Sequence, residues 1–184
     1  MHFFIEHNKG HHKRVATYDD PGTARRGESV YLFWVRAILV CYRNAWKIAG
    51  REAAHKGRAV ISLYNEMLRM QVVQLVFSAV IALFFGFFAL CCFLIASVIG
   101  ILMLETVNYI EHYGLQRKSL GDGKYERPLP VHSWNSDHIM GRLMLFELSR
   151  HSDHHFQASR KYQILRHHDE APQMPTGYPG MMLL

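Results

Sequence analysis

An uncharged stretch in the middle of the chain limits the possible folds more than any other feature. Residues 75–104 contain no charged side chain. A straight helix of this length would measure about 45 Å, whereas the hydrocarbon layer of a bilayer is roughly 30 Å thick. Two packed helices, about residues 60–85 and 88–114 with a break near Gly86, fit such a layer better than one span. The alternative is a single long helix that crosses the membrane at a tilt.

Basic residues flank this stretch on both sides. The chain has a formal net charge of +6, yet no Lys or Arg occurs between Met70 and Gln116. This distribution is typical of membrane helices whose two ends face the cytoplasm. The basic residues form no stripe and accompany no nucleic-acid-binding motif, so we expect no nucleic acid partner. Cys41, Cys91 and Cys92 lie in apolar surroundings without CxxC spacing, and we expect them to stay reduced.

The other segments carry weaker structural signals. Residues 15–28 contain Asp, Pro and Gly, which predict a loop. Residues 29–48 are apolar but interrupted by two arginines, which predicts an amphipathic helix on the membrane or against the protein. Residues 118–131 predict a surface loop or a short hairpin, and residues 138–166 have helical spacing. Together with the apolar stretch, these segments predict an all-α integral membrane protein.

Histidine is unusually frequent, at 13 of 184 residues. Seven histidines occupy three short segments: His7, His11 and His12 in the first, His112 in the second, and His151, His154 and His155 in the third. On an α-helix, His7 and His11 would share one face, with His12 displaced by about 100°. The spacing in the third segment, i, i+3 and i+4, also places its imidazoles on one side. Such clusters can bind one metal ion or two adjacent ions, whereas an isolated helical histidine is more often a surface or packing residue.

The positions of these histidines also bear on the membrane topology. His12 precedes the apolar stretch and His112 follows it. If both contribute to one site, the chain must cross the bilayer an even number of times, which favours a hairpin over a single span. The alternative for His112 is an interfacial residue without a ligand role. We therefore expect a transmembrane helical hairpin together with cytoplasmic helices that carry the histidine clusters.

The residues around the histidines narrow the kind of metal site. A zinc protease would carry HExxH, but here the glutamate precedes the histidine, in Glu6-His7 and in Glu111-His112. Soluble di-iron bundles use glutamate ligands with ExxH pairs, and the sequence contains no such set. Imidazole alone does not select among zinc, copper, iron and nickel. Many neutral imidazoles beside membrane helices favour a histidine-rich di-iron centre that acts on a lipid-like molecule.

Several residues near the histidines have two interpretations. Glu6, Glu111 and Asp153 adjoin histidines, and each either orients an imidazole or is an ordinary solvated charge. His132 and His138 are expected to support the site or the fold rather than to bind metal. These five residues are therefore candidates for contacts around a metal site, not for its ligands.

Four segments together resemble a known family. EHNKGHH (residues 6–12), NYIEHYGLQR (108–117), LSRHSDHH (148–155) and PQMPTGY (172–178) closely resemble motifs of the integral-membrane alkane hydroxylases, or alkane 1-monooxygenases. The resemblance covers essentially the whole chain. The NYIEHYG element distinguishes this family from the fatty acid desaturases, which share HxxHH motifs. The resemblance implies a membrane fold like that of the fatty acid desaturases.

The resemblance also implies an activity and a cofactor. It implies a non-haem enzyme with two iron ions, located in the cytoplasmic (inner) membrane with several spans and an active site on the cytoplasmic side. Such an enzyme inserts one oxygen atom of O2 into the terminal methyl group of a medium- or long-chain n-alkane. Rubredoxin, reduced by rubredoxin reductase with NAD(P)H, supplies the electrons. Matched residue by residue, the implied iron ligands are His7, His11, His12, His112, His151, His154 and His155.

The chain departs from the family pattern in two places. The family's first histidine motif, HELGHK or similar, does not occur, and the last motif is LSRHSDHHF where the family commonly has LQRHSDHHA. We therefore expect residues 1–184 to form one partial membrane hydroxylase domain from the C-terminal part of a longer enzyme. Its expected parts are residues 1–58, with the first histidine segment and an amphipathic helix, residues 59–114, the transmembrane hairpin, and residues 115–184, with the last histidine segment.

Two alternatives remain open. One is a related membrane di-iron desaturase or hydroxylase that acts on another lipid-like substrate. The other is a metal-binding membrane fragment without catalysis. Analysis of the products formed from alkanes and from fatty acyl chains would distinguish these possibilities from alkane hydroxylation.

Overall fold

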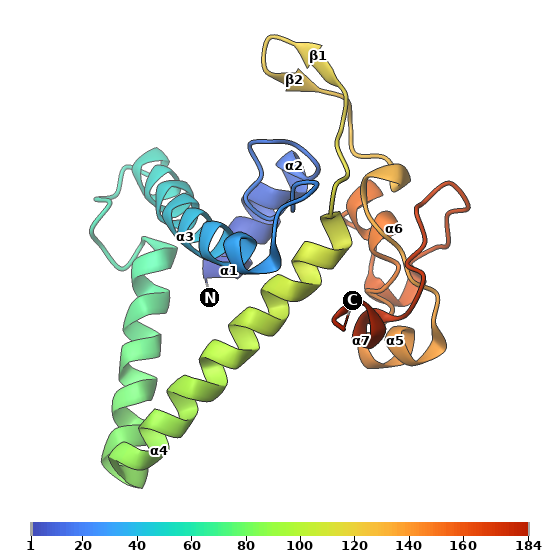
Figure 1. Cartoon of the computed structure of the whole chain (residues 1–184). Coiled ribbons are helices and arrows are strands. Elements are labelled where there is room, and N and C mark those ends of the chain that lie inside the picture. The colour runs from blue at the N-terminus through green and yellow to red at the C-terminus, as the bar shows by residue number, and fades with distance from the viewer. Residues whose placement is uncertain (1, 184) are drawn as a thin grey trace.

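The computed structural model describes residues 2–183, and its main feature is one long, sharply bent helix (Figure 1). The helices are α1 (His2–Glu6), α2 (His12–Arg14), α3 (Val30–His55), α4 (Glu66–His112), α5 (Ile139–Met144), α6 (His151–Phe156) and α7 (Tyr178–Met181). There are also a π-helix, η1 (His7–His11), and two 3-10 turns, η2 (Pro130–His132) and η3 (Tyr162–Ile164). Two short strands, β1 (Ser119–Gly121) and β2 (Lys124–Tyr125), pair antiparallel. The described residues are mostly helical, as the sequence predicts.

Helix α4 begins at a capped position and bends at a glycine. The side chain of Asn65 accepts hydrogen bonds from the backbone N–H groups of Met67 and Leu68, at 2.9 and 3.3 Å. At Gly86 the backbone leaves the helical region, with φ 84° and ψ 171°, a conformation that is easy for glycine and costly for other residues. The two arms of the helix diverge from this point in a V (Figure 1). The predicted break near Gly86 is confirmed.

The surface of α4 is apolar along both arms. Its mean hydropathy reaches 2.8, and within residues 2–183 it is the one helix long and apolar enough to cross a membrane. Leu83, Phe84 and Phe88, near the bend, are between 78% and 82% exposed. The rings of Phe77 and Phe93 pack between the two arms, with their centroids 5.5 Å apart. An apolar surface of this extent is stable against lipid or another protein rather than against water.

One short N-terminal segment contacts both ends of α4. At the start of the helix, Lys9 Nζ lies 3.0 Å from Glu66 Oε2. At its end, the ring centroid of His112 lies 4.8 Å from that of His11. Since α4 has 47 residues, contacts from one segment to both ends require the bend at Gly86.

Helix α3 packs against both α1 and α4. It begins close to the predicted start but continues to His55, beyond the predicted end at residue 48. Its buried face repeats every four residues and is mostly small: Phe33, Ala37, Cys41, Ala45, Ala49 and Ala53. On its other side Leu32 and Leu39 are exposed. The predicted amphipathic helix is confirmed, and one of its faces lies against the protein.

The C-terminal part agrees with the sequence prediction only partly. Strands β1 and β2 form a short hairpin within residues 118–131, which confirms one of the two predicted alternatives. Residues 138–166 do not form continuous helix, because α5 ends at Met144 and α6 begins at His151. Between them Phe146 and Glu147 have positive φ angles of 52° and 63°, which an α-helix cannot contain. The helical prediction is wrong here because this turn has no glycine or proline to reveal it.

Candidate metal centre

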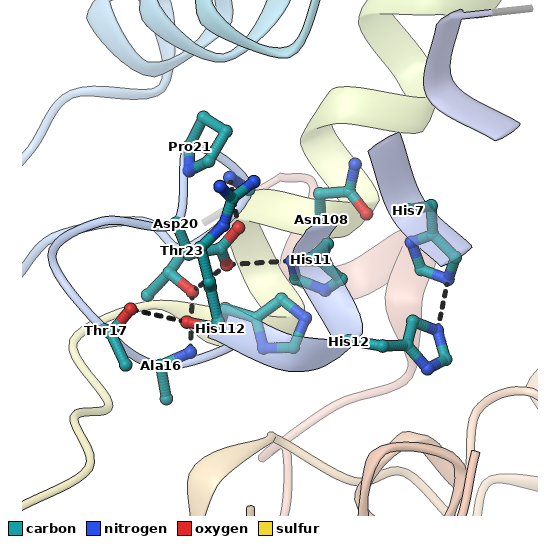
Figure 2. A network of polar contacts seen from close by, with 12 residues as sticks. His7, His11, His12, Ala16, Thr17, Asp20, Pro21, Thr23, Asn108 and His112 are labelled. Atoms are coloured by element: carbon teal, nitrogen blue, oxygen red, sulfur yellow. Dashed lines mark hydrogen bonds and ion pairs between the residues drawn. The ribbon is translucent and has the colours of Figure 1, made fainter. Parts of the chain in front are cut away.

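The first histidine segment contains a turn that is wider than an α-helical turn. Residues His7–His11 form a π-helix, in which the backbone N–H of His12 donates to the carbonyl of His7. As a result His7 and His12 face the same way, and their Nε2 atoms lie 3.0 Å apart (Figure 2). The prediction that His12 is displaced from His7 is therefore wrong, because it assumed an α-helix. With His154 of α6, these residues offer ligand atoms within 4.8 Å of one another; we call them the first histidine group.

A second histidine group lies beside the first. His11, His112 and His155 each offer a ring nitrogen within 4.8 Å of the others. His151 joins them, because its Nε2 lies 3.1 Å from Nε2 of His112 and 2.9 Å from Nε2 of His155. The second histidine group thus comprises these four residues. The fold brings together all seven histidines that the sequence analysis singled out.

The positions of these nitrogens fit metal ions. Two ligand nitrogens that each lie about 2.1 Å from one ion, with an N–metal–N angle of about 90°, would lie about 3.0 Å apart. The close Nε2 pairs in the two groups are separated by 2.9 to 3.1 Å. The buried Nε2 of His11 has no hydrogen-bond partner among residues 2–183, a costly state unless a ligand meets it. The donor set could therefore hold one metal ion in each group.

Burial favours the neutral form of five of these imidazoles. It lowers the pKa of His12 to about 3 and the pKa of His154 to about 4. Burial also lowers the pKa values of His7, His151 and His155, and the charges of neighbouring imidazoles act in the same direction. Only neutral imidazole has a free nitrogen lone pair, so these five residues can bind metal at neutral pH without losing a proton.

Asp20 fixes the orientation of His11 (Figure 2). Its Oδ2 lies 2.8 Å from Nδ1 of His11, and both side chains are buried. Burial alone would lower the pKa of His11, but the charge of Asp20 and this hydrogen bond raise it overall. With Nδ1 engaged, Nε2 is the nitrogen that His11 offers to the second histidine group.

A loop and a helix hold Asp20 in place. Thr23 Oγ1 donates to Oδ2 of Asp20 at 2.5 Å, and the backbone N–H of Gly22 donates to Oδ1 at 3.2 Å. Arg36 of α3 donates to the carbonyls of Pro21 and Thr23, both at 3.1 Å. Sequence reasoning missed Asp20 and assigned this segment only as a loop. The available signal was DDPGT, a turn motif with an acidic residue soon after the first histidine segment.

Glu111 faces the second histidine group directly. Its Oε2 lies 3.3 Å from Nε2 of His151. Together with His112 and His151, it forms a further set with ligand atoms within 4.8 Å of one another. Its Oε1 accepts a hydrogen bond of 2.6 Å from the hydroxyl of Tyr178. Glu111 thus lies beside an imidazole, as predicted, but this imidazole belongs to His151 and not to the adjacent His112.

Three of the other predicted supporting residues make their contacts outside the two histidine groups. Glu6 is buried and pairs with Arg14. Asp153 is buried and lies 2.8 Å from Nε2 of His168, which belongs to neither group. His138 is exposed and borders an apolar cavity. None of these three has a hydrogen bond to either histidine group within residues 2–183.

An apolar cavity of about 1550 Å³ adjoins the second histidine group through Tyr178. Its lining includes one face of α4 from Gly100 to Val107, much of α5, and the C-terminal segment around Tyr178. Tyr178 contributes to the cavity wall while its hydroxyl contacts Glu111. A concave, mostly apolar site of this kind suits an apolar ligand.

Comparisons with known proteins agree with this geometry. The family model described as fatty acid desaturase matches residues 2–183. Alkane 1-monooxygenase 1 of Alcanivorax borkumensis is 48% identical over 183 residues, which is 100% of this chain and 45% of the relative. An alkane 1-monooxygenase of Pseudomonas putida is 47% identical over 183 residues, 100% of this chain and 46% of the relative.

A more distant relative has a different name. The hydroxylase component of a xylene/toluene monooxygenase from Pseudomonas putida is 30% identical over 183 residues, 97% of this chain and 47% of the relative. The chain spans about half the length of the curated relatives it matches. Because the family model covers almost every residue, the chain belongs to the fatty acid desaturase family.

Proposed function

We propose that this chain is part of a membrane-bound, non-haem di-iron monooxygenase. It hydroxylates the terminal methyl group of medium- or long-chain n-alkanes with O2. The observation that carries the proposal is the convergence of the two histidine groups beside an apolar cavity. The printed names of two relatives, both alkane 1-monooxygenases at 47% and 48% identity, support the reaction.

We assign one iron ion to each histidine group. The first would be held by His7, His12 and His154, and the second by His11, His112, His151 and His155. An unactivated alkane has no group for acid–base attack, so the bound iron supplies the O2 chemistry. Burial favours the neutral form of His12 and of most of the other imidazoles, and Asp20 orients His11.

The apolar cavity is the proposed position of the alkane chain. Tyr178 lines the cavity and contacts Glu111, which in turn lies 3.3 Å from His151. The side chains of Tyr178 and Glu111 therefore separate an alkane in this cavity from the second histidine group. Apolar walls give the alkane dispersion contacts along its length.

We propose that the two arms of α4 cross the bilayer as a hairpin within residues 59–114. The bend at Gly86 would face away from the cytoplasm, and residues 1–58 and 115–184 would lie on the cytoplasmic side of the inner membrane. The uncharged arms, the basic residues at both ends and the contacts of Lys9 and His11 with the two ends of α4 support this topology.

We propose rubredoxin, kept reduced by rubredoxin reductase and NAD(P)H, as the electron donor. The support is the resemblance of EHNKGHH and NYIEHYG to motifs of the rubredoxin-dependent alkane hydroxylases. NADH consumption that depends on both octane and rubredoxin is the expected behaviour. Equal rates with and without rubredoxin would contradict this assignment.

Product analysis tests the reaction itself. The protein in membranes, supplied with rubredoxin, its reductase and NADH, is expected to convert octane to 1-octanol. The second candidate is a related di-iron hydroxylase or desaturase of another apolar substrate, which the relative named for xylene and toluene favours. Products from toluene or fatty acyl chains without 1-octanol would support that candidate. Bound iron without any product would indicate a metal-binding membrane fragment.

A further inference from the structure

We infer that Glu111 provides an oxygen ligand to the metal ion of the second histidine group and that Tyr178 positions this carboxylate. The inference rests on the proposed metal centre. It adds one carboxylate to a donor set otherwise made of imidazoles. It also gives a role to PQMPTGY, the sequence motif that contains Tyr178 and that the proposed function does not otherwise use.

Glu111 approaches Nε2 of His151, the ring nitrogen that faces the other histidines of the group, and not Nδ1. Nε2 of His151 is the atom that lies 3.1 Å from Nε2 of His112 and 2.9 Å from Nε2 of His155. Oε2 of Glu111 lies 3.3 Å from the same nitrogen. A carboxylate that only orients a histidine ligand binds the other ring nitrogen, as Asp20 does at Nδ1 of His11. The Oε2 atom therefore lies in a ligand position.

An ionised Glu111 would require a partner that the side chains do not supply. Glu111 is 5% exposed, and no Lys or Arg within residues 2–183 forms an ion pair with it. A buried carboxylate without a cation is strongly unfavourable. A divalent metal ion bound to His112 and His151 would provide the missing positive charge, since these two residues and Glu111 already converge.

Tyr178 determines which oxygen of Glu111 is free. Its hydroxyl donates to Oε1 at 2.6 Å, so Oε2 remains for the metal. The ring of Tyr178 is 3% exposed and packs with Ile110 and Met174. Met174 is fixed in turn, because its backbone N–H donates to the carbonyl of Asn135 at 2.8 Å. The C-terminal segment thus holds the phenol hydroxyl rigidly against the carboxylate.

Two conservative variants test the inference in the intact protein purified from membranes. Glu111→Gln keeps the size of the side chain but removes its charge, and Tyr178→Phe keeps the ring but removes the donor. Tyr162→Phe is the matched control, because Tyr162 is 43% exposed and lies outside the site. Each protein is titrated with Fe²⁺ under anaerobic conditions and examined by Mössbauer spectroscopy, which reports the two iron environments separately.

Both Glu111→Gln and Tyr178→Phe are expected to change one of the two ferrous signals and to weaken binding of that iron by about 10-fold or more. Tyr162→Phe is expected to change neither. Wild-type signals and affinity in Glu111→Gln would overturn the ligand assignment. A change in Glu111→Gln without one in Tyr178→Phe would overturn the positioning role. If the wild-type protein binds no iron, the proposed metal centre itself fails, which is a different result from either.

Discussion

Oδ2 of Asp20 lies 2.8 Å from Nδ1 of His11, and this contact connects the loop between α2 and α3 to the second histidine group. The loop is held at its other side by Arg36, which donates to two of its carbonyls. Because Asp20 and His11 are both buried, neither can exchange its partner for water without cost. The orientation of His11 therefore depends on residues that bind no metal.

Asp20→Asn is expected to weaken binding of the iron in the second histidine group by about 10- to 100-fold. The amide loses the charge that favours an N–H at Nδ1 of His11, so Nε2 is presented less reliably. Iron content per protein and Fe²⁺ titration measure the effect. Asp19→Asn is the matched control, because Asp19 is an exposed neighbour. Equal losses in the two variants would show that the contact with His11 is unimportant.

Gly22→Ala is expected to displace His11 even though position 22 binds no metal. A Cβ atom at this position would lie 2.8 Å from Nδ1 of His11, closer than such contacts allow. Overpacking of this kind destabilises by about 1–3 kcal/mol, so both the melting temperature and the bound iron should fall. Gly141→Ala serves as the control, because its Cβ would meet no atom within 4 Å. Unchanged iron content in Gly22→Ala would argue against a fixed position for His11.

In the full-length enzyme, His112→Ala is expected to abolish turnover and to lower bound iron. His112 is fully buried at the end of α4 and lies among the rings of His11, His151 and His155. The control is His55→Ala, because His55 is exposed at the end of α3. Normal iron content in the His112 variant would remove this residue from the ligand set.

Cysteine labelling in intact cells tests the hairpin topology. The native cysteines Cys41, Cys91 and Cys92 are first replaced. In this background Phe87→Cys, next to the bend of α4 and exposed, should react with a membrane-impermeant reagent added outside the cytoplasm. Asp122→Cys, in the turn between β1 and β2, should remain unlabelled. Labelling at position 122 would favour the single-span alternative.

The sequence was sufficient to predict those features that depend on composition and on the spacing of residues close together in the chain. The break near Gly86 followed from the length of the uncharged stretch and the glycine within it. The spacing of His151 and His155, one helical turn apart, correctly placed both imidazoles on one side of α6. Both inferences depend on local geometry, which the order of residues largely determines.

Other parts of the site could not be predicted, for physical reasons that differ between residues. The contact of Asp20 with His11 depends on how a loop folds back, and residue spacing does not report that. Glu6 was expected beside His7, but consecutive residues on a helix point about 100° apart, and Glu6 binds Arg14 instead. Tyr178 and Glu111 are separated by 67 residues, so their hydrogen bond depends on the tertiary fold alone.

The π-helix at residues 7–11 has a consequence for the geometry of a two-metal site. His7 and His12 belong to one histidine group and His11 to the other, so a single wide turn reaches both. If each group held an ion, the covalent backbone of this turn would help to set the separation between the two ions. On an α-helix over the same residues, His12 would be displaced by about 100° from the face that His7 and His11 share, so its Nε2 would not meet that of His7. The winding of this one short turn thus places ligand nitrogens of the first histidine segment in both groups, which α4 and α6 complete.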